Sequence, residues 1–139
     1  MKSSRLMISV AFALFVLLTP AFAQSPAIRV TVPFDFTVGK QTLAAGDYRV
    51  SLDDMGLLWV KDVGGAGSVA VWTNPIGDSP NQAPAPQLVF NRYGNHYFLA
   101  KVRMANRAGE LFASSQELEY ARTTHQERTT TLASRTDGK

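Results

Sequence analysis

The sequence predicts a mainly β fold, an antiparallel sandwich or small barrel of about six strands with one C-terminal helix. Three observations predict this class. Apolar and polar residues alternate with a period of two through the middle of the chain, as in half-buried strands. Glycine-containing turns separate these alternating runs. The chain has no cysteine, so packing and sheet hydrogen bonds must stabilise it without disulfides.

The first predicted strand covers residues 29–38. One face of this strand is apolar and consists of Val30, Val32, Phe34, Phe36 and Val38. Mostly polar residues occupy the other face. Pro33 has no N–H to donate, which predicts that the strand lies at a sheet edge there. The same alternation predicts further strands at residues 48–52, 57–63 and 68–73.

Two connections have distinctive compositions. The glycine-rich residues 64–67 join two predicted strands and indicate a hairpin loop. Residues 74–86 contain four prolines, which exclude a helix and a central strand and predict an extended surface loop.

Residues 87–93 and 96–104 flank Gly94-Asn95, a pattern typical of a two-residue hairpin with glycine at its first turn position. Both faces of this hairpin are apolar, so it is expected in the middle of the sheet with both faces covered. The turn predicts three facing pairs: Arg92 with Tyr97, Phe90 with Leu99, and Val89 with Ala100.

Residues 114–128 are predicted to form the helix. Ser114 and Glu117 match a capping box, but the apolar stripe of Leu118, Tyr120 and Ala121 is thin. Such a helix is stable only when it packs against the rest of the fold. The polar residues 129–139 are expected to be a disordered tail, so residues 24–128 form the single predicted domain.

The N-terminus has the pattern of a signal peptide. Lys2 and Arg5 precede an apolar run, and Ala21-Phe22-Ala23 places small residues at the two positions that a signal peptidase reads. The run is shorter than the roughly 20 residues that a membrane-spanning helix needs. We therefore expect residues 1–23 to be removed after Ala23, with a bacterial periplasmic or secreted product and no membrane span after cleavage.

Charge gives no indication of a nucleic-acid partner. Removal of the signal peptide takes away Lys2 and Arg5, so 12 of the 14 basic residues remain beside 11 acidic ones and the net charge is close to zero. The arginines are scattered along the sequence. Proteins that bind polyanions concentrate basic charge in patches, so no such partner is predicted.

Catalytic residues are not predicted. The two histidines, His96 and His125, lie near a turn and late in the weak helix, and no serine occupies a Gly-x-Ser-x-Gly elbow. Carboxylates that could act as acids or bases are Asp35, Glu117 and Glu119, but no two of them are placed to converge.

Metal and cofactor sites are not predicted either. His125 and Glu127 are two residues apart, which puts them on different helix faces. Asp53 and Asp54 lack the spacing of a calcium loop. The glycine-rich residues 64–67 are followed by a strand, whereas a phosphate-binding loop is followed by a helix.

Aromatic residues give the one candidate binding surface: Trp59, Trp72, Tyr93 and Tyr97. As a ligand or partner surface, such side chains can line a groove for a sugar or an apolar ligand. They can equally fill the core of a domain without disulfides, and we favour the core for them.

Three segments resemble a group of small exported bacterial proteins found notably in acidobacteria: residues 32–39 (Phe-x-Phe-x-Val-Gly), 43–50 (Ala-Gly-x-Tyr-x-Val) and 88–99 (Leu-Val-Phe-x-Arg-Tyr-Gly-x-x-Tyr-Phe-Leu). The resemblance implies a compact β domain and assigns no catalytic residue. The segment at 43–50 also resembles the strand entry of transthyretin-like and PEGA-type sandwich modules, which implies a binding or structural role.

The expected function is therefore that of an exported, non-enzymatic domain that binds a protein or a cell-surface polymer in the envelope. The alternative is a carrier that holds a small apolar ligand inside a β-barrel, and a hydrolase comes third.

Overall fold

The computed structural model describes residues 26–77, 85–124 and 127–133, the last of these by backbone only. Within these residues it contains ten strands and one short helix near the C-terminal end, which confirms the mainly β prediction with more strands than expected. The strands are β1 (Ala27–Val32), β2 (Phe36–Val38), β3 (Gln41–Leu43), β4 (Gly46–Leu52), β5 (Leu57–Asp62), β6 (Ser68–Ile76), β7 (Gln87–Tyr93), β8 (His96–Arg103), β9 (Ala108–Leu111) and β10 (Glu127–Ala133), and the helix is α2 (Ser115–Thr123).

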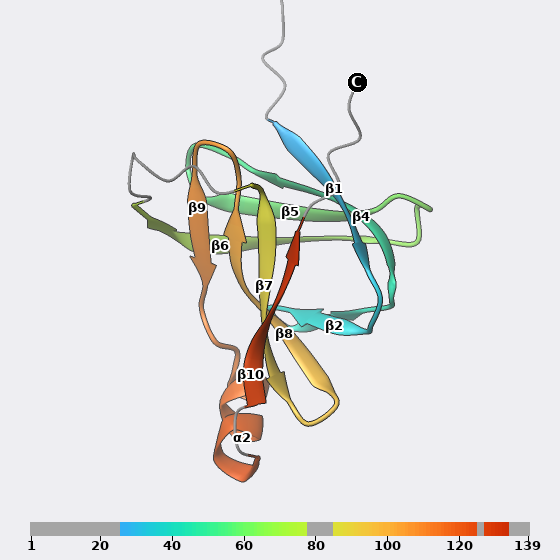
Figure 1. The fold of residues 1–139 in the computed structure, drawn as a ribbon, viewed down its shortest axis with the longest axis vertical. Coiled ribbons are helices and arrows are strands. Elements are labelled where there is room, and N and C mark those ends of the chain that lie inside the picture. The colour runs from blue at the N-terminus through green and yellow to red at the C-terminus, as the bar shows by residue number, and fades with distance from the viewer. Residues whose placement is uncertain (1–25, 78–84, 125–126, 134–139) are drawn as a thin grey trace, which may run out of the picture.

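The strands form two layers that share β6. In the first layer, β1, β4, β5 and β6 are antiparallel neighbours in that order. In the second layer, β6 pairs with β9, β9 with β8, and β8 with β7. Strand β10 pairs with the outer edge of β7. Figure 1 shows β5 and β6 running across the view while β7, β8 and β9 run along its length. The strand order begins at β1, and among the described residues no strand pair joins β1 to the other end of the order. The fold is therefore sandwich-like rather than a closed barrel.

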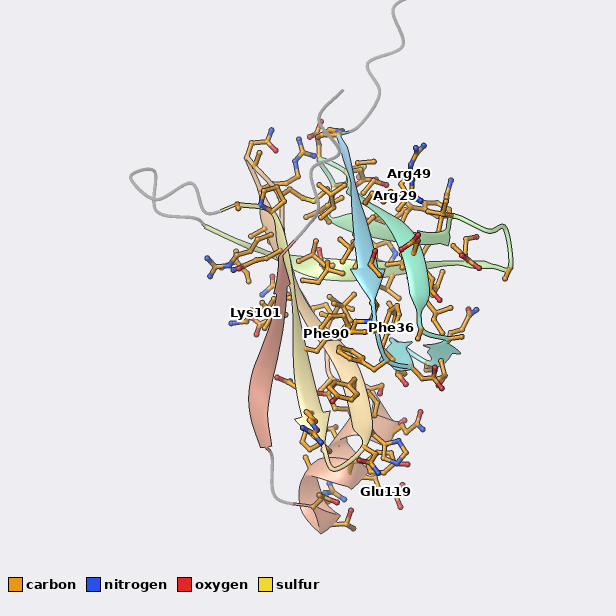
Figure 2. All side chains as sticks on the ribbon, turned by 45° about the vertical axis from the view of Figure 1, so that its right-hand side comes forward. Arg29, Phe36, Arg49, Phe90, Lys101 and Glu119 are labelled. Carbon is orange, nitrogen blue, oxygen red and sulfur yellow. The ribbon has the colours of Figure 1, made fainter. Side chains whose placement is uncertain are left out.

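The core lies between the layers and is built from alternate residues of nearly every strand. Phe36 and Phe90 are almost completely buried, and their ring centroids are 5.5 Å apart in an edge-to-face arrangement. Figure 2 shows both side chains pointing into the space between the layers. Tyr48 packs on Phe36 in the same way, at 5.1 Å. These aromatic contacts supply the packing that a chain without cysteine requires.

The first predicted strand is interrupted where proline occurs. Val30, Val32, Phe36 and Val38 are buried as predicted, but β1 ends before Pro33 and β2 begins at Phe36. β1 pairs with β4 in one layer, whereas β2 lies parallel to β8 in the other, with Thr37 facing Phe98. Pro33 therefore marks the point at which the chain crosses between layers.

The predicted hairpin is present as β7 and β8, with Gly94 at a φ of 62°. Two predicted pairs, Arg92 with Tyr97 and Phe90 with Leu99, are confirmed. The third is wrong, because a bulge shifts the register and Val89 faces Lys101. The edge of β8 that faces away from β7 pairs first with β2 and then with β9. The bulge lies between these two pairings, where a local bend lets β8 contact both neighbours.

The proline-rich connection begins later than predicted. β6 extends to Ile76 and includes Pro75, which faces Gly109 of β9. Strand β9, which was not predicted, is short and contains a glycine that permits close approach. A Cβ on Gly109 would lie 2.5 Å from Thr73 Oγ1.

The C-terminal end also differs from the prediction. The helix ends at Thr123 rather than at residue 128, and Glu127–Ala133 form β10 where a helix end and disordered tail were expected. β10 is polar in sequence and gains its hydrogen bonds from the exposed edge of β7, a partner that local sequence does not show.

No helix within the described residues is long and apolar enough to span a membrane. The expected signal peptide at residues 1–23 and the last residues of the expected tail lie outside the described part of the chain.

Candidate functional site

A groove of about 480 Å³ runs beside β6, between this strand, the β2–β3 turn and the segment after β9. We call it the β6 groove. Its aliphatic residues are buried or half-buried: Val38, Val69, Val71 and Leu111. Its exposed rings are Trp72 and Phe112, which are 59% and 69% exposed. Lys40, Gln41 and Ser114 supply polar groups at the border. The volume and the mostly apolar lining are typical of binding sites.

The groove follows a strand edge that has no strand partner among the described residues. β9 pairs with β6 only from Thr73 onwards, so the same edge at Ser68–Val71 is open. The N–H of Thr73 donates to Gly56 O at 2.8 Å on the β5 side. Since hydrogen bonds alternate along an antiparallel strand, the N–H and C=O of Ala70 point to the open edge.

The β2–β3 turn depends on Gly39. Its φ is 61°, a conformation that side chains other than glycine rarely adopt, and a Cβ there would lie 3.0 Å from Val71 Cγ1. Glycine therefore lets the turn approach β6 and form one side of the groove.

The two tryptophans are exposed, so the expectation that they belong to the core is wrong. Trp59 faces Ala70 and Trp72 faces Leu57 across the β5–β6 ladder, which places both rings on the outer face of this layer. Trp59 is 38% exposed, and Lys61 Nζ lies 5.3 Å from its ring centroid. Phe112 was not singled out from the sequence. It directly follows Leu111, whose side chain is buried. Because neighbouring residues of an extended chain point to opposite sides, this order is the sequence signal that could have indicated an exposed ring at position 112.

Tyr93 and Tyr97 are not part of this surface. Tyr93 is buried at the end of β7, and its hydroxyl donates to Glu117 Oε1 at 3.2 Å. Burial, followed by the nearby Glu117 charge and this hydrogen bond, raises the pKa of Tyr93. Tyr97 stacks on Phe34 with ring centroids 3.8 Å apart. For these two residues the packing interpretation holds.

Glu117 joins α2 to the sheet instead of facing solvent. Its backbone N–H donates to Ser114 Oγ at 3.2 Å, which confirms the predicted N-cap. Its buried side chain accepts hydrogen bonds from Asn91 and Tyr93. Leu118 is exposed, so the helix is held by this buried carboxylate and by Tyr120, whose ring packs on His96 and Phe98.

The other acidic candidates bind backbone or neighbouring side chains. Asp35 accepts a hydrogen bond from the Ala45 N–H at 3.0 Å. Asp53 accepts from two amides of its own turn, and Asp54 pairs with Arg107. Glu119 is exposed on α2. None of these contacts brings two carboxylates together.

The glycine-rich loop is a hairpin connection between β5 and β6, as predicted. Asp62 accepts hydrogen bonds from the N–H groups of Gly64 and Ala66, at 2.9 and 3.2 Å. A carboxylate of the chain itself therefore occupies the amides that a phosphate would need.

His96 packs on Tyr120 with ring centroids 4.3 Å apart, and within the described part of the chain no hydrogen bond joins it to an acid. His125 lies outside the described residues. Among the described residues, no three acidic, histidine or cysteine side chains are grouped as a metal site would require.

Comparisons of the chain with protein-family models, with curated proteins and with solved structures found no match.

Proposed function

We propose that this chain is an exported, non-enzymatic binding domain of the bacterial envelope, periplasmic or secreted, and that its β6 groove receives an extended segment of a partner protein. Export is supported by the N-terminal charge, apolar run and Ala-x-Ala site. The observation that carries the binding role is the open edge of β6 beside an apolar groove with two exposed rings.

Such an edge can add a strand from another chain. The Ala70 N–H and C=O supply main-chain hydrogen bonds, and alternate side chains of the added segment enter the apolar groove. Trp72 and Phe112 flank the position of that segment. Protein domains rarely leave an open strand edge beside exposed aromatic rings without a partner, because such edges pair with other chains.

A carrier role is the second candidate, and the groove volume of about 480 Å³ favours it because small-molecule sites have volumes in that range. In this role the ligand would lie in the open groove, since side chains fill the space between the layers. Native mass spectrometry of the processed chain from its own envelope separates the two roles. A bound molecule of low mass that is lost in Trp72→Ala supports the carrier.

Site-specific photo-crosslinking tests the protein partner. We place a photoreactive amino acid at position 112 in the groove and, in a matched protein, at exposed position 118 on α2. We expect one discrete protein adduct from position 112 in the native envelope and none from position 118.

A second change checks the strand-addition geometry. Ala70→Pro removes the N–H that points to the open edge, and proline is tolerated where that N–H is unused in the fold. The adduct should disappear while far-ultraviolet circular dichroism is unchanged. Equal labelling from positions 112 and 118, or an adduct that survives Ala70→Pro, contradicts strand addition.

A further inference from the structure

Three basic residues that are far apart in sequence form a line across the outer face of the first layer. Arg29 of β1 faces Arg49 of β4, and Arg49 faces Lys61 of β5. All three are exposed. We call them the basic row. Figure 2 shows Arg29 and Arg49 side by side and directed away from the core, on the side of the molecule opposite Lys101.

This arrangement is unfavourable for the isolated domain. Like charges directly opposite each other on adjacent strands destabilise a sheet. Arg29 has a compensating partner in Asp47, at 3.3 Å. Arg49, in the middle of the row, makes no ion pair or hydrogen bond within the described part of the chain. The row therefore presents positive charge at Arg49 that no acidic side chain of the described residues pairs with and that an anionic partner would neutralise.

An aromatic ring lies beside the row. Trp59 precedes Lys61 by two residues on the same face of β5, and Lys61 Nζ lies 5.3 Å from its ring centroid. Ser51 faces Trp59 from β4, so a polar hydroxyl and a flat ring adjoin the charges. Rings with hydrogen-bonding groups around them suit ligands that have both apolar faces and polar edges, as sugars do.

The exposed ring favours a polysaccharide over an acidic peptide. Trp59 is 38% exposed and lies on the same face as the charges, so a sugar ring can pack flat against it. A linear chain of uronate sugars carries one carboxylate on each ring, and so supplies both the ring for Trp59 and the charges for the row.

We propose that the basic row and Trp59 form a second binding surface, for an acidic polysaccharide of uronate sugars. The carboxylates pair with Arg49 and Lys61, and a sugar ring packs against Trp59. This surface shares no residue with the β6 groove and adds a ligand class to the proposed protein-binding role.

Binding to polygalacturonate tests the proposal. Residues 24–139 should bind the polymer at low salt and weaken as salt is added, because the contacts are charge pairs at the surface. The fully methyl-esterified polymer has the same rings without the charges and should not bind. The double change Arg49→Gln/Lys61→Gln should weaken binding about tenfold or more, as expected for loss of two charged contacts.

Lys101→Gln is the matched control, since it removes one exposed positive charge from another part of the surface. It should leave binding within about twofold, which is below the energy of one charged contact. No binding to polygalacturonate, equal binding to the esterified polymer, or equal loss in Lys101→Gln overturns the proposal. Binding to phosphatidylglycerol vesicles but not to polygalacturonate overturns it in favour of a lipid headgroup.

The two proposals fail independently. Arg49→Gln/Lys61→Gln leaves the groove intact, so the adduct from position 112 should persist in that variant. If the unchanged chain binds the polysaccharide but gives no adduct from position 112, the groove proposal alone is rejected.

Discussion

The inward and outward side chains of β1, β4 and β5 belong to the same strands but have opposite physical properties. Val30, Val50 and Val60 point inward and are almost completely buried. Their sequence neighbours Arg29, Arg49 and Lys61 point outward, are exposed and form a row of like charge. A shift of one residue in any of these strands would exchange the two sets.

The difference separates stability from binding within one sheet. Burial of the inward set stabilises the fold, whereas the outward set lowers the free energy of unfolding slightly through charge repulsion. Changes on the inner side should therefore affect unfolding most, and changes on the outer side should affect binding with little effect on unfolding.

Phe90→Ala should have the largest effect. The ring is completely buried and contacts Phe34 and Phe36, with centroids 5.2 and 5.5 Å apart. Its removal leaves a cavity, and we expect the free energy of unfolding to fall by about 3–5 kcal/mol in chemical denaturation. Trp72→Ala on the outer side should change it by about 0.5 kcal/mol at most. Similar losses in the two variants would contradict the division between the faces.

Glu117→Ala should have the next largest effect, although it changes a surface helix. It leaves the Asn91 amide and the Tyr93 hydroxyl without their acceptor, and one unsatisfied buried donor costs about 1–3 kcal/mol. Glu119→Ala, on the same helix but exposed, should cost about 0.5 kcal/mol or less. Figure 2 shows Glu119 on α2 at the end of the molecule. Equal effects in thermal unfolding would show that Glu117 does not hold the helix.

Alkaline pH should destabilise the fold through two buried phenols. Burial, followed by the charges of Asp62 and Asp35, raises the pKa of Tyr48, and burial and Glu117 raise that of Tyr93. Above pH 10.0 these tyrosines lose protons in the unfolded chain first, so unfolding becomes more favourable as pH rises.

The slope should reach at most about 1.4 kcal/mol per pH unit for each tyrosine, with no contribution well below pH 10. Denaturation at several alkaline pH values measures it. The double variant Tyr48→Phe/Tyr93→Phe should show a shallower decline than the unchanged chain. Identical slopes in the two proteins would mean that these phenols titrate alike in the folded and unfolded chain.

Arg49→Gln should have the smallest effect and the opposite sign. It removes the central charge of the basic row, so the free energy of unfolding should rise by about 0.2–1 kcal/mol at low salt. The gain should shrink at high salt, where exposed charges are screened. Lys101→Gln, which breaks a contact with Glu110, should not stabilise the chain. Destabilisation by Arg49→Gln would mean that the row contributes to folding.

Much of the fold could be predicted because it depends on local patterns. Alternation identified the buried faces of β1, β2 and β4, and the Gly94-Asn95 turn fixed two of three facing pairs in the β7–β8 hairpin. Strands β3, β9 and β10 were missed because they are short or polar and become strands only by pairing with β2, β6, β8 and β7. Tertiary pairing overrides local propensity in such segments.

Less of the candidate sites could be predicted. Trp59 and Trp72 were identified as binding candidates but assigned to the core, since alternation does not say which face of a strand is covered. Phe112 and the open edge of β6 depend on where β9 ends against β6.

The sequence by itself determined the alternating strands and the cap of α2, because each depends on residues close together in the chain. Only the tertiary structure decided that Arg29, Arg49 and Lys61 form one row and that the Glu117 side chain is buried between α2 and the sheet. The physical reason is that strand register joins residues across long loops, and the contacts it creates have no signature in the local order of residues.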